Sequence, residues 1–231
     1  MGSERLNRGT FITFEGADGV GKSTHVNLLA QALEKKGIRV VVTREPGGTE
    51  GAEKIRSLLK EGDKDTWHPI SEVLLLYAAR YDHVVKVIKP ELESGAWVIC
   101  DRFTDSTLAY QCFAHQLPLG WVQGINDLVL DGFEPDITFF MDNDAEDTFK
   151  RVERRALESG NPDAMDRVEK LGVDFQKRLL EGYRILAKQQ DRFETIDARK
   201  DKLQVHQDIC RALAARGTPL TPLTPPEFQS A

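Results

Sequence analysis

The sequence has few cysteines and lacks any long hydrophobic run. Its three cysteines lie far apart among 231 residues, at positions 100, 112 and 210. This usage fits reduced thiols and neither a disulfide framework nor a zinc site. The longest nearly unbroken apolar run, from Val73 to Ala79, is far shorter than the ~18 residues that span a bilayer. No charged and then apolar signal segment precedes Gly16. These absences predict a cytoplasmic protein without a membrane partner.

An excess of positive charge is also lacking, since 37 acidic residues outnumber 31 basic ones. The formal net charge is −6, which argues against non-specific binding of nucleic acid, because phosphate backbones attract basic surfaces. The five histidines, at positions 25, 68, 83, 115 and 206, show no metal-ligand spacing. We therefore expect no nucleic-acid partner, and any basic residues that bind phosphate must be gathered locally.

Short apolar segments alternate with helical ones along most of the chain. The segments typical of strands are 10–15, 38–43, 96–101, 136–142 and 193–198. The intervening pattern predicts helices, including a long one over 71–94 with a bend near Pro90, a charged helical hairpin over 144–192 and a closing helix over 202–216. This alternation predicts a three-layer α/β fold, in which helices flank a five-stranded parallel sheet.

The two ends of the chain differ from this pattern. Residues 217–231 hold four of the ten prolines, so neither a helix nor a central strand is expected there. We predict a single domain over residues 9–216 and a flexible proline-rich tail over 217–231, with the first eight residues also loosely held.

A glycine-rich loop follows the first predicted strand. Residues 16–23 have the spacing Gly-x-x-x-x-Gly-Lys-Ser, which lets backbone N–H groups wrap closely around nucleotide phosphates at the start of a helix. Lys22 is expected to reach the β- and γ-phosphates, and the Ser23 hydroxyl to bind Mg²⁺. The predicted ATP-binding residues are Gly16, Ala17, Asp18, Gly19, Val20, Gly21, Lys22, Ser23 and Thr24.

One residue of this loop is acidic. A carboxylate beside phosphates repels them, so Asp18 either stabilises the loop through hydrogen bonds to backbone N–H groups or accepts a hydrogen bond from a hydroxyl of a second substrate.

Residues outside the loop indicate which class of phosphate-loop protein this is. The sequence has no Asn-Lys-x-Asp stretch that would bind guanine, and no arginine finger or oligomerisation module follows FFMD at 139–142. A kinase acting on a small molecule fits best.

Five stretches in order, FEGADGVGKST, VTREPGGT, YAARYDH, DRFTDSTLAYQ and MDRVE, closely resemble the bacterial thymidylate kinase family. The resemblance covers about residues 9–216. It implies transfer of the γ-phosphate of ATP to dTMP, giving dTDP, with Mg²⁺ as cofactor. It also implies the nucleoside-monophosphate-kinase version of the phosphate-loop fold, a helical lid over about 149–168, and a homodimer packed through helices.

The resemblance also assigns roles to residues beyond the glycine-rich loop. Arg102 would bind the dTMP phosphate, for which a guanidinium fork is suited. Asp101 is placed to hold a water on Mg²⁺, and Asp18 would accept a hydrogen bond from the 3′-hydroxyl. Arg80 would donate to the thymine 4-oxygen. The expected lining of the acceptor site is Asp18, Pro46, Leu76, Arg80, Arg102, Ser106, Thr107, Tyr110 and Gln111. Within that set Thr107 would meet the base and Tyr110 the sugar.

Positive side chains are needed near the migrating phosphoryl group to stabilise its negative charge. The glycine-rich loop contains no arginine, so the resemblance assigns this charge to the lid, whose basic residues are Lys150, Arg151, Arg154, Arg155 and Arg167. We favour Arg155 and Arg167 as catalytic residues beside Lys22, Arg102 and Asp18. A solvated charged face remains the alternative, because five acidic residues nearly cancel the lid's charge.

Three features depart from the family pattern. Leu76 replaces the usual phenylalanine that stacks on thymine, CFAHQL follows Gln111 in place of a glycine run, and ESGNPDA lengthens the lid. A kinase with a shifted base preference, or a nucleotide-binding protein without turnover, therefore stays open. Any of the kinase hypotheses requires that the loop after the first strand and the Asp101–Arg102 turn after the third strand face each other.

Overall fold

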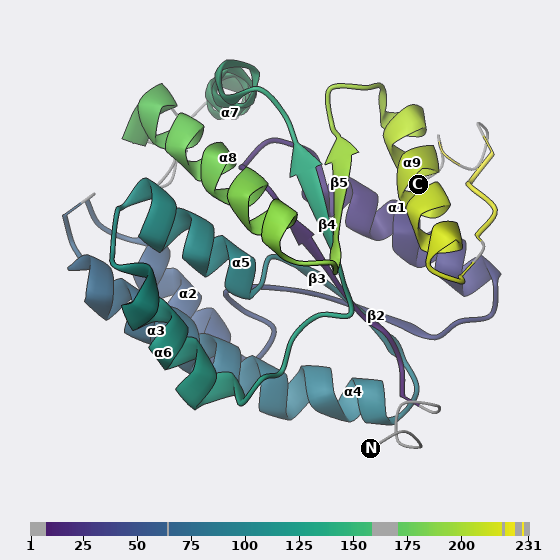
Figure 1. The fold of residues 1–231 in the computed structure, drawn as a ribbon, viewed down its shortest axis with the longest axis horizontal. Coiled ribbons are helices and arrows are strands. Elements are labelled where there is room, and N and C mark those ends of the chain that lie inside the picture. The colour runs from purple at the N-terminus through teal and green to yellow at the C-terminus, as the bar shows by residue number, and fades with distance from the viewer. Residues whose placement is uncertain (1–7, 64, 159–170, 219, 225–227, 229–231) are drawn as a thin grey trace.

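The computed structural model describes the chain except for residues 1–7, 64, 159–170, 219, 225–227 and 229–231. Its centre is a parallel sheet with the strand order β2-β3-β1-β4-β5 (Figure 1). The strands are β1 (Phe11–Glu15), β2 (Val40–Arg44), β3 (Trp97–Asp101), β4 (Ile137–Asp142) and β5 (Phe193–Asp197). All five predicted strands are therefore confirmed, and their ends differ from the prediction by at most two residues.

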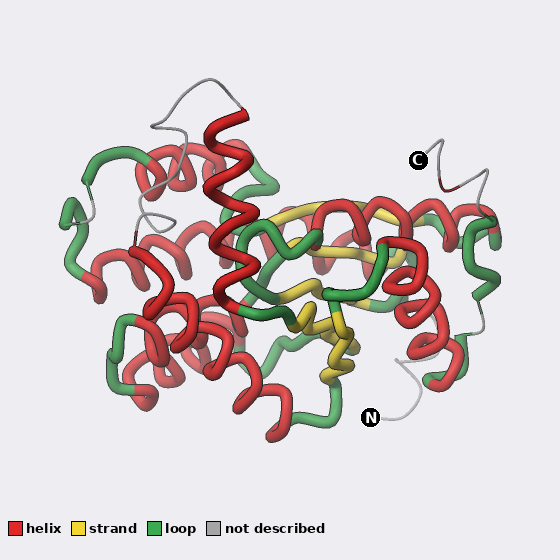
Figure 2. The backbone as a smooth tube through the Cα atoms, turned by 90° about the horizontal axis from the view of Figure 1, so that it is seen from above, coloured by secondary structure: helices red, strands yellow, loops and turns green. Residues whose placement is uncertain are grey.

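The central strands are apolar on both faces because helices cover both faces of the sheet. Every residue of β1 is buried, whereas β2, at the edge, has no fully buried residue. Figures 1 and 2 show the sheet as a twisted layer between two groups of helices. The three-layer α/β fold is confirmed.

One face of the sheet is covered by α1 (Lys22–Lys35) and α9 (Lys202–Ala215). The opposite face is covered by α3 (Pro69–His83), α4 (Lys89–Glu93), α6 (Leu119–Leu130) and α8 (Gly172–Gln189). Two further helices are α2 (Glu50–Lys60), which packs on α3, and α7 (Ala145–Glu158), which packs on α8. The short helix α5 (Thr104–Thr107) follows β3.

The long predicted helix over 71–94 is divided in the structure. Between α3 and α4 lies a π-helical segment, η2 (Val84–Ile88), and Pro90 is the second residue of α4. Proline has no backbone N–H to donate, so the regular i to i−4 pattern cannot continue through it. A second π-helical segment, η3 (Leu108–Ala114), extends α5.

Part of the proline-rich tail contacts the domain. Leu220 is buried against the α1 and α9 cluster, and Leu223 is buried beside Leu28 and Ala32 of α1. The described tail residues between 217 and 224 contain neither helix nor strand, as expected, but Phe228 is helical and donates its N–H to the Thr224 carbonyl at 2.9 Å. Flexibility of the tail as a whole stays a prediction. Among the described residues, no helix has the length and apolar character needed to cross a membrane.

Candidate active site

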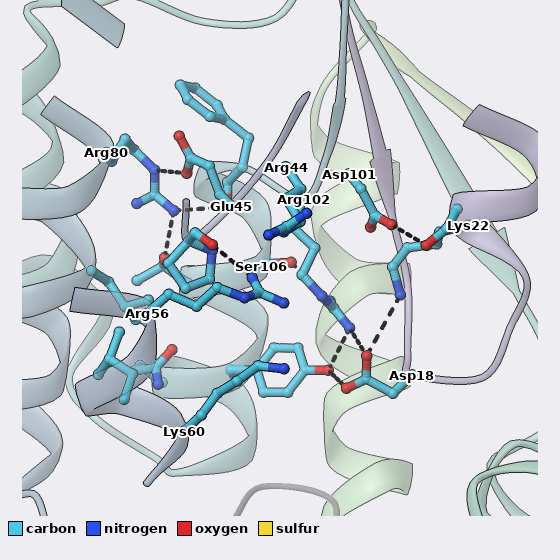
Figure 3. A pocket seen from close by; sticks show the side chains of 18 of the residues that line it. Asp18, Lys22, Arg44, Glu45, Arg56, Lys60, Arg80, Asp101, Arg102 and Ser106 are labelled. Carbon is cyan, nitrogen blue, oxygen red and sulfur yellow. Dashed lines mark hydrogen bonds and ion pairs between the residues drawn. The ribbon is translucent and has the colours of Figure 1, made fainter. Parts of the chain in front are cut away.

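A cavity of about 650 Å³ opens at the carboxyl ends of β1, β2 and β3, the edge at which open α/β sheets bind ligands. Four helical segments, α1, α2, α3 and α5–η3, complete its walls (Figure 3). Its lining residues are Asp18, Gly19, Gly21, Lys22, Ser23, Thr24, Arg44, Glu45, Pro46, Arg56, Leu59, Lys60, Glu72, Leu76, Arg80, Asp101, Arg102, Phe103, Ser106, Thr107, Tyr110 and Gln111.

The glycine-rich loop forms one side of the cavity. Gly21 has φ of 100° and precedes α1, so the chain turns there through a conformation that favours glycine. A Cβ at Gly16 would lie 2.8 Å from the Met141 carbonyl oxygen, so a side chain there would clash with the backbone of β4. The Lys22 ammonium is buried and donates to the carbonyl oxygens of Gly16 and Ala17, at 3.1 and 2.8 Å. Burial and the positive charge of Arg102 lower the pKa of Lys22.

The loops after β1 and β3 meet directly. The Ser23 hydroxyl donates to a carboxylate oxygen of Asp101 over 2.7 Å, and Figure 3 shows Asp101 close to Lys22 of the glycine-rich loop. Because β1 pairs with β3 in the sheet, both loops leave the sheet side by side. The spatial condition on which the kinase interpretation depends is therefore met.

Arg102 is held by contacts from several elements. Its backbone has φ of 72°, an uncommon value for a residue with a side chain. Nη2 donates to Asp18 at 2.8 Å and to the Tyr110 hydroxyl at 2.9 Å. Nη1 donates to the Gly16 carbonyl, at 2.9 Å. Burial opposes ionisation of Asp18, but Arg102 and Lys22 outweigh burial and hold its pKa well below the usual range.

Arg80 lies on another wall and is almost fully buried. Its Nε donates to Glu45 at 2.7 Å, and its Nη2 donates to Thr107 and to the Phe103 carbonyl at 3.0 Å each. Its Nη1 is buried and has no hydrogen-bond partner in the described part of the chain. An unpaired buried donor is unfavourable, so Nη1 is suited to an acceptor on a ligand.

Most of the predicted site residues share this cavity. All the residues predicted to bind the acceptor line it, as do the metal-binding candidates Ser23 and Asp101. Three residues predicted to bind ATP, Gly16, Ala17 and Val20, are buried and do not line it. The side chain of Arg155 and the whole of Arg167 lie outside the described residues.

Comparison with known proteins agrees with this geometry. A sequence model described as "Thymidylate kinase" matches residues 14–209. The chain belongs to the thymidylate kinase family. It is 44% identical over 194 residues to a thymidylate kinase of Caulobacter vibrioides, covering 84% of this chain and 90% of that protein. A thymidylate kinase of Prosthecochloris aestuarii is 43% identical over 209 residues, covering 89% and 93%.

A solved structure of the thymidylate kinase family has the same fold. The crystal structure of thymidylate kinase from Ehrlichia chaffeensis superposes with a TM-score of 0.70 and 36% sequence identity, covering 89% of this chain and 99% of that one. The resemblance predicted from the five motifs is therefore confirmed.

Several lining residues were not predicted from the sequence. Arg44 and Glu45 lie within the TREPGGT motif, of which only Pro46 was assigned. Arg56 and Lys60 are four residues apart on α2 and both reach the cavity, a spacing that places them on one face. This spacing is visible in the sequence, but basic residues four apart are equally common on solvated helix faces, so it does not single these two out.

Proposed function

We propose that this protein transfers the γ-phosphoryl group of ATP to dTMP, giving dTDP and ADP. The observation that carries the proposal is the contact between Ser23 and Asp101, which joins the phosphate-binding loop to the acceptor side of one cavity. Membership of the thymidylate kinase family supports the same reaction. A shifted base preference and a loss of turnover are not favoured.

On the donor side, the start of α1 points its N–H groups and positive dipole end at the ATP phosphates. Lys22 exchanges the carbonyl oxygens of Gly16 and Ala17 for oxygens of the β- and γ-phosphates. Since its ammonium is already buried at the loop, little ordering is needed on binding. The charge of Lys22 then stabilises the negative charge of the transferring group.

On the acceptor side, Arg102 binds the phosphate of dTMP and orients its attacking oxygen. Asp18 accepts a hydrogen bond from the 3′-hydroxyl, and Tyr110 packs beside the sugar. The ion pair between Asp18 and Arg102, at 2.8 Å, joins the groups that hold the two ends of the deoxyribose phosphate. Proximity and orientation are the main contributions of these residues.

The thymine base is recognised at the wall of the cavity that contains Arg80. Arg80 donates from Nη1 to the thymine 4-oxygen, and Thr107, which holds the same guanidinium, lies next to the base. Glu45 fixes the direction of Arg80 through its hydrogen bond to Nε. Leu76, Pro46, Ser106 and Gln111 complete the lining.

The oxygens of Ser23 and Asp101 fit a magnesium ion, which takes one or two protein oxygens together with phosphate oxygens and waters. When bound, Mg²⁺ would supply positive charge that neutralises the negative charge developing on the transferring phosphoryl group. Ser23 would bind it through the hydroxyl and Asp101 through a water. The same two side chains are 2.7 Å apart, so both reach one ion.

The lid remains part of the proposal. A Cβ at Gly19 would lie 3.3 Å from the Val152 side chain, so α7 lies next to the phosphate-binding loop. Arg155 follows on the same helix, and we retain it with Arg167 as the lid residues that contact the migrating group. Closure of such a lid also excludes water.

We further propose a cytoplasmic homodimer. The three cysteines are free and buried, as is usual in reducing compartments. The adjoining helices α3 and α6 carry the exposed apolar residues Leu74, Trp121 and Leu128, which a second copy of the chain would cover.

An acceptor panel tests the function. Purified protein with MgATP is offered dTMP, dUMP, dCMP, dGMP and AMP, and ADP release is followed in a coupled assay. We expect the highest kcat/KM with dTMP. A higher value with another nucleotide would show shifted base preference, and ATP binding without acceptor-dependent turnover would show a non-catalytic protein.

A further inference from the structure

A fully buried carboxylate lies beneath the acceptor side of the cavity. Glu15, the last residue of β1, is 0% exposed. One of its oxygens accepts the Phe103 N–H at 2.7 Å, and the other accepts the hydroxyls of Ser106 and Tyr183 at 2.5 and 3.0 Å. A buried charge is tolerated only when hydrogen bonds satisfy it in this way.

The same two hydroxyls also contact Arg102. Its Nη1 donates to Ser106 at 3.0 Å and to Tyr183 at 3.2 Å, and the two hydroxyl oxygens are 2.8 Å apart. Each hydroxyl therefore accepts from the guanidinium and donates to the carboxylate. The two hydroxyls thus stand between Glu15 and Arg102 and link the buried anion to the cation of the cavity.

Tyr183 comes from α8, on the face of the sheet opposite α1 (Figure 1). Its ring stacks on Phe140 of β4 with centroids 5.3 Å apart, and the side chain is fully buried. The aromatic stacking fixes the ring, so the hydroxyl has one available position. Tyr183 is separated from Arg102 by 81 residues in the chain and does not line the cavity.

We propose that Tyr183 is a positioning residue: with Ser106, its hydroxyl keeps the Arg102 guanidinium directed at the acceptor phosphate and away from the buried Glu15. Without the hydroxyl, Glu15 loses a donor, and Arg102 is a cation close enough to replace it. The guanidinium then turns inward, and the phosphate loses its partner. This inference rests on the proposed function, in which Arg102 binds the phosphate of the acceptor.

The test compares dTMP with thymidine, which has the same base and sugar but no phosphate. Dissociation constants and steady-state kinetics are measured for the wild type and Tyr183→Phe, with Tyr81→Phe, an exposed tyrosine on α3, as matched control. We expect Tyr183→Phe to weaken dTMP binding about tenfold, as for loss of a hydrogen bond to a charged group. Thymidine affinity, the KM for ATP and the melting temperature should stay close to wild type.

A double-mutant cycle with Arg102→Ala isolates the coupling. If Tyr183 acts through Arg102, adding Tyr183→Phe to Arg102→Ala causes little further loss of dTMP affinity. An unchanged dTMP affinity in Tyr183→Phe, an equal loss for dTMP and thymidine, or an additive cycle would overturn the inference. If Tyr183→Phe is poorly folded, Ser106→Ala removes the other hydroxyl; because Ser106 also lines the cavity, the ratio of dTMP affinity to thymidine affinity is then the deciding readout.

Failure of the proposed function has a different signature. A wild-type protein that does not use dTMP contradicts that function alone. The comparison of nucleotide with nucleoside then proceeds with the acceptor chosen by the panel, and the same outcomes decide the role of Tyr183.

Discussion

Single side chains decide how tightly the base is held. Leu76, which the motif resemblance places against the base, lines the cavity. A leucine provides an apolar wall but cannot stack on a ring, and stacking contributes ~1 kcal/mol beyond area burial. We predict that Leu76→Phe tightens dTMP binding about fivefold, measured by calorimetry. Leu119→Phe, outside the cavity, serves as control. An unchanged or weaker affinity would contradict the placement of Leu76 against the base.

Lys22 has a clear expected effect on turnover. Its ammonium is the buried cation of the phosphate-binding loop, and its removal leaves the transferring phosphoryl group less neutralised. We predict that Lys22→Ala lowers kcat on the order of 100-fold or more, while the circular dichroism spectrum stays unchanged. A near-normal kcat in Lys22→Ala would contradict a catalytic role for Lys22.

Glu15 makes stability depend on pH. Burial and the nearby Asp105 carboxylate raise the pKa of Glu15 to about 7, above the value near 4.5 expected in the unfolded chain. Between these two values the folded state binds the extra proton, so the contribution of Glu15 to stability falls as pH rises through this window. Asp18, with a lowered pKa, titrates below it.

Glu15→Gln removes this titration. We predict that the free energy of unfolding of the wild type, relative to Glu15→Gln, decreases between about pH 4.5 and pH 7, as measured by urea denaturation. The amide itself changes the hydrogen bonds of Ser106 and Tyr183, which shifts the free energy of unfolding at every pH. The test is therefore how the difference between the two proteins changes with pH, and not its absolute size. Parallel profiles for the two proteins would contradict a raised pKa at Glu15.

The start of α2, the helix that carries the cavity residues Arg56 and Lys60, is capped by a side chain. The Thr49 hydroxyl accepts the Ala52 N–H at the start of α2 and donates to Asp82 of α3. Loss of such a cap typically lowers stability by ~1 kcal/mol. We predict this loss for Thr49→Ala in urea denaturation and near-wild-type stability for Thr49→Ser, which keeps the hydroxyl. Equal stability of all three proteins would show that the cap is not needed.

The strands and their order of appearance were predictable because each is a compact apolar segment bounded by loop residues. The bend near Pro90 was predicted, but the π-helical form of η2 and η3 was not, because no residue pattern in either segment distinguishes a π-helix from an α-helix. Motifs likewise located Lys22, Arg102 and Arg80. The contacts that fix them were missed because their partners are remote: Glu45 lies 35 residues from Arg80, and Tyr183 lies 168 residues from Glu15.

The molecule as a whole has an apolar face on the adjoining helices α3 and α6. Leu74 is 54% exposed, Trp121 61% and Leu128 85%. Single exposed apolar residues are usual on monomers, but several on adjoining helices indicate a surface that a partner covers. We predict a homodimer through this face, and a monomer for Leu128→Glu, measured by light scattering after size exclusion. Leu157→Glu, on α7, should remain dimeric. A monomeric wild type would contradict the assignment.

The pairing of β1 with β3 has a consequence for how this chain can vary. Neighbouring strands of a sheet are about 4.8 Å apart, and the ladder from Phe11 to Phe14 holds β1 and β3 in one register. The backbone hydrogen bonds between β1 and β3 therefore fix how far apart the proposed ATP and dTMP phosphate sites lie. Insertions in the surface loops can lengthen the chain without moving the two reacting groups apart.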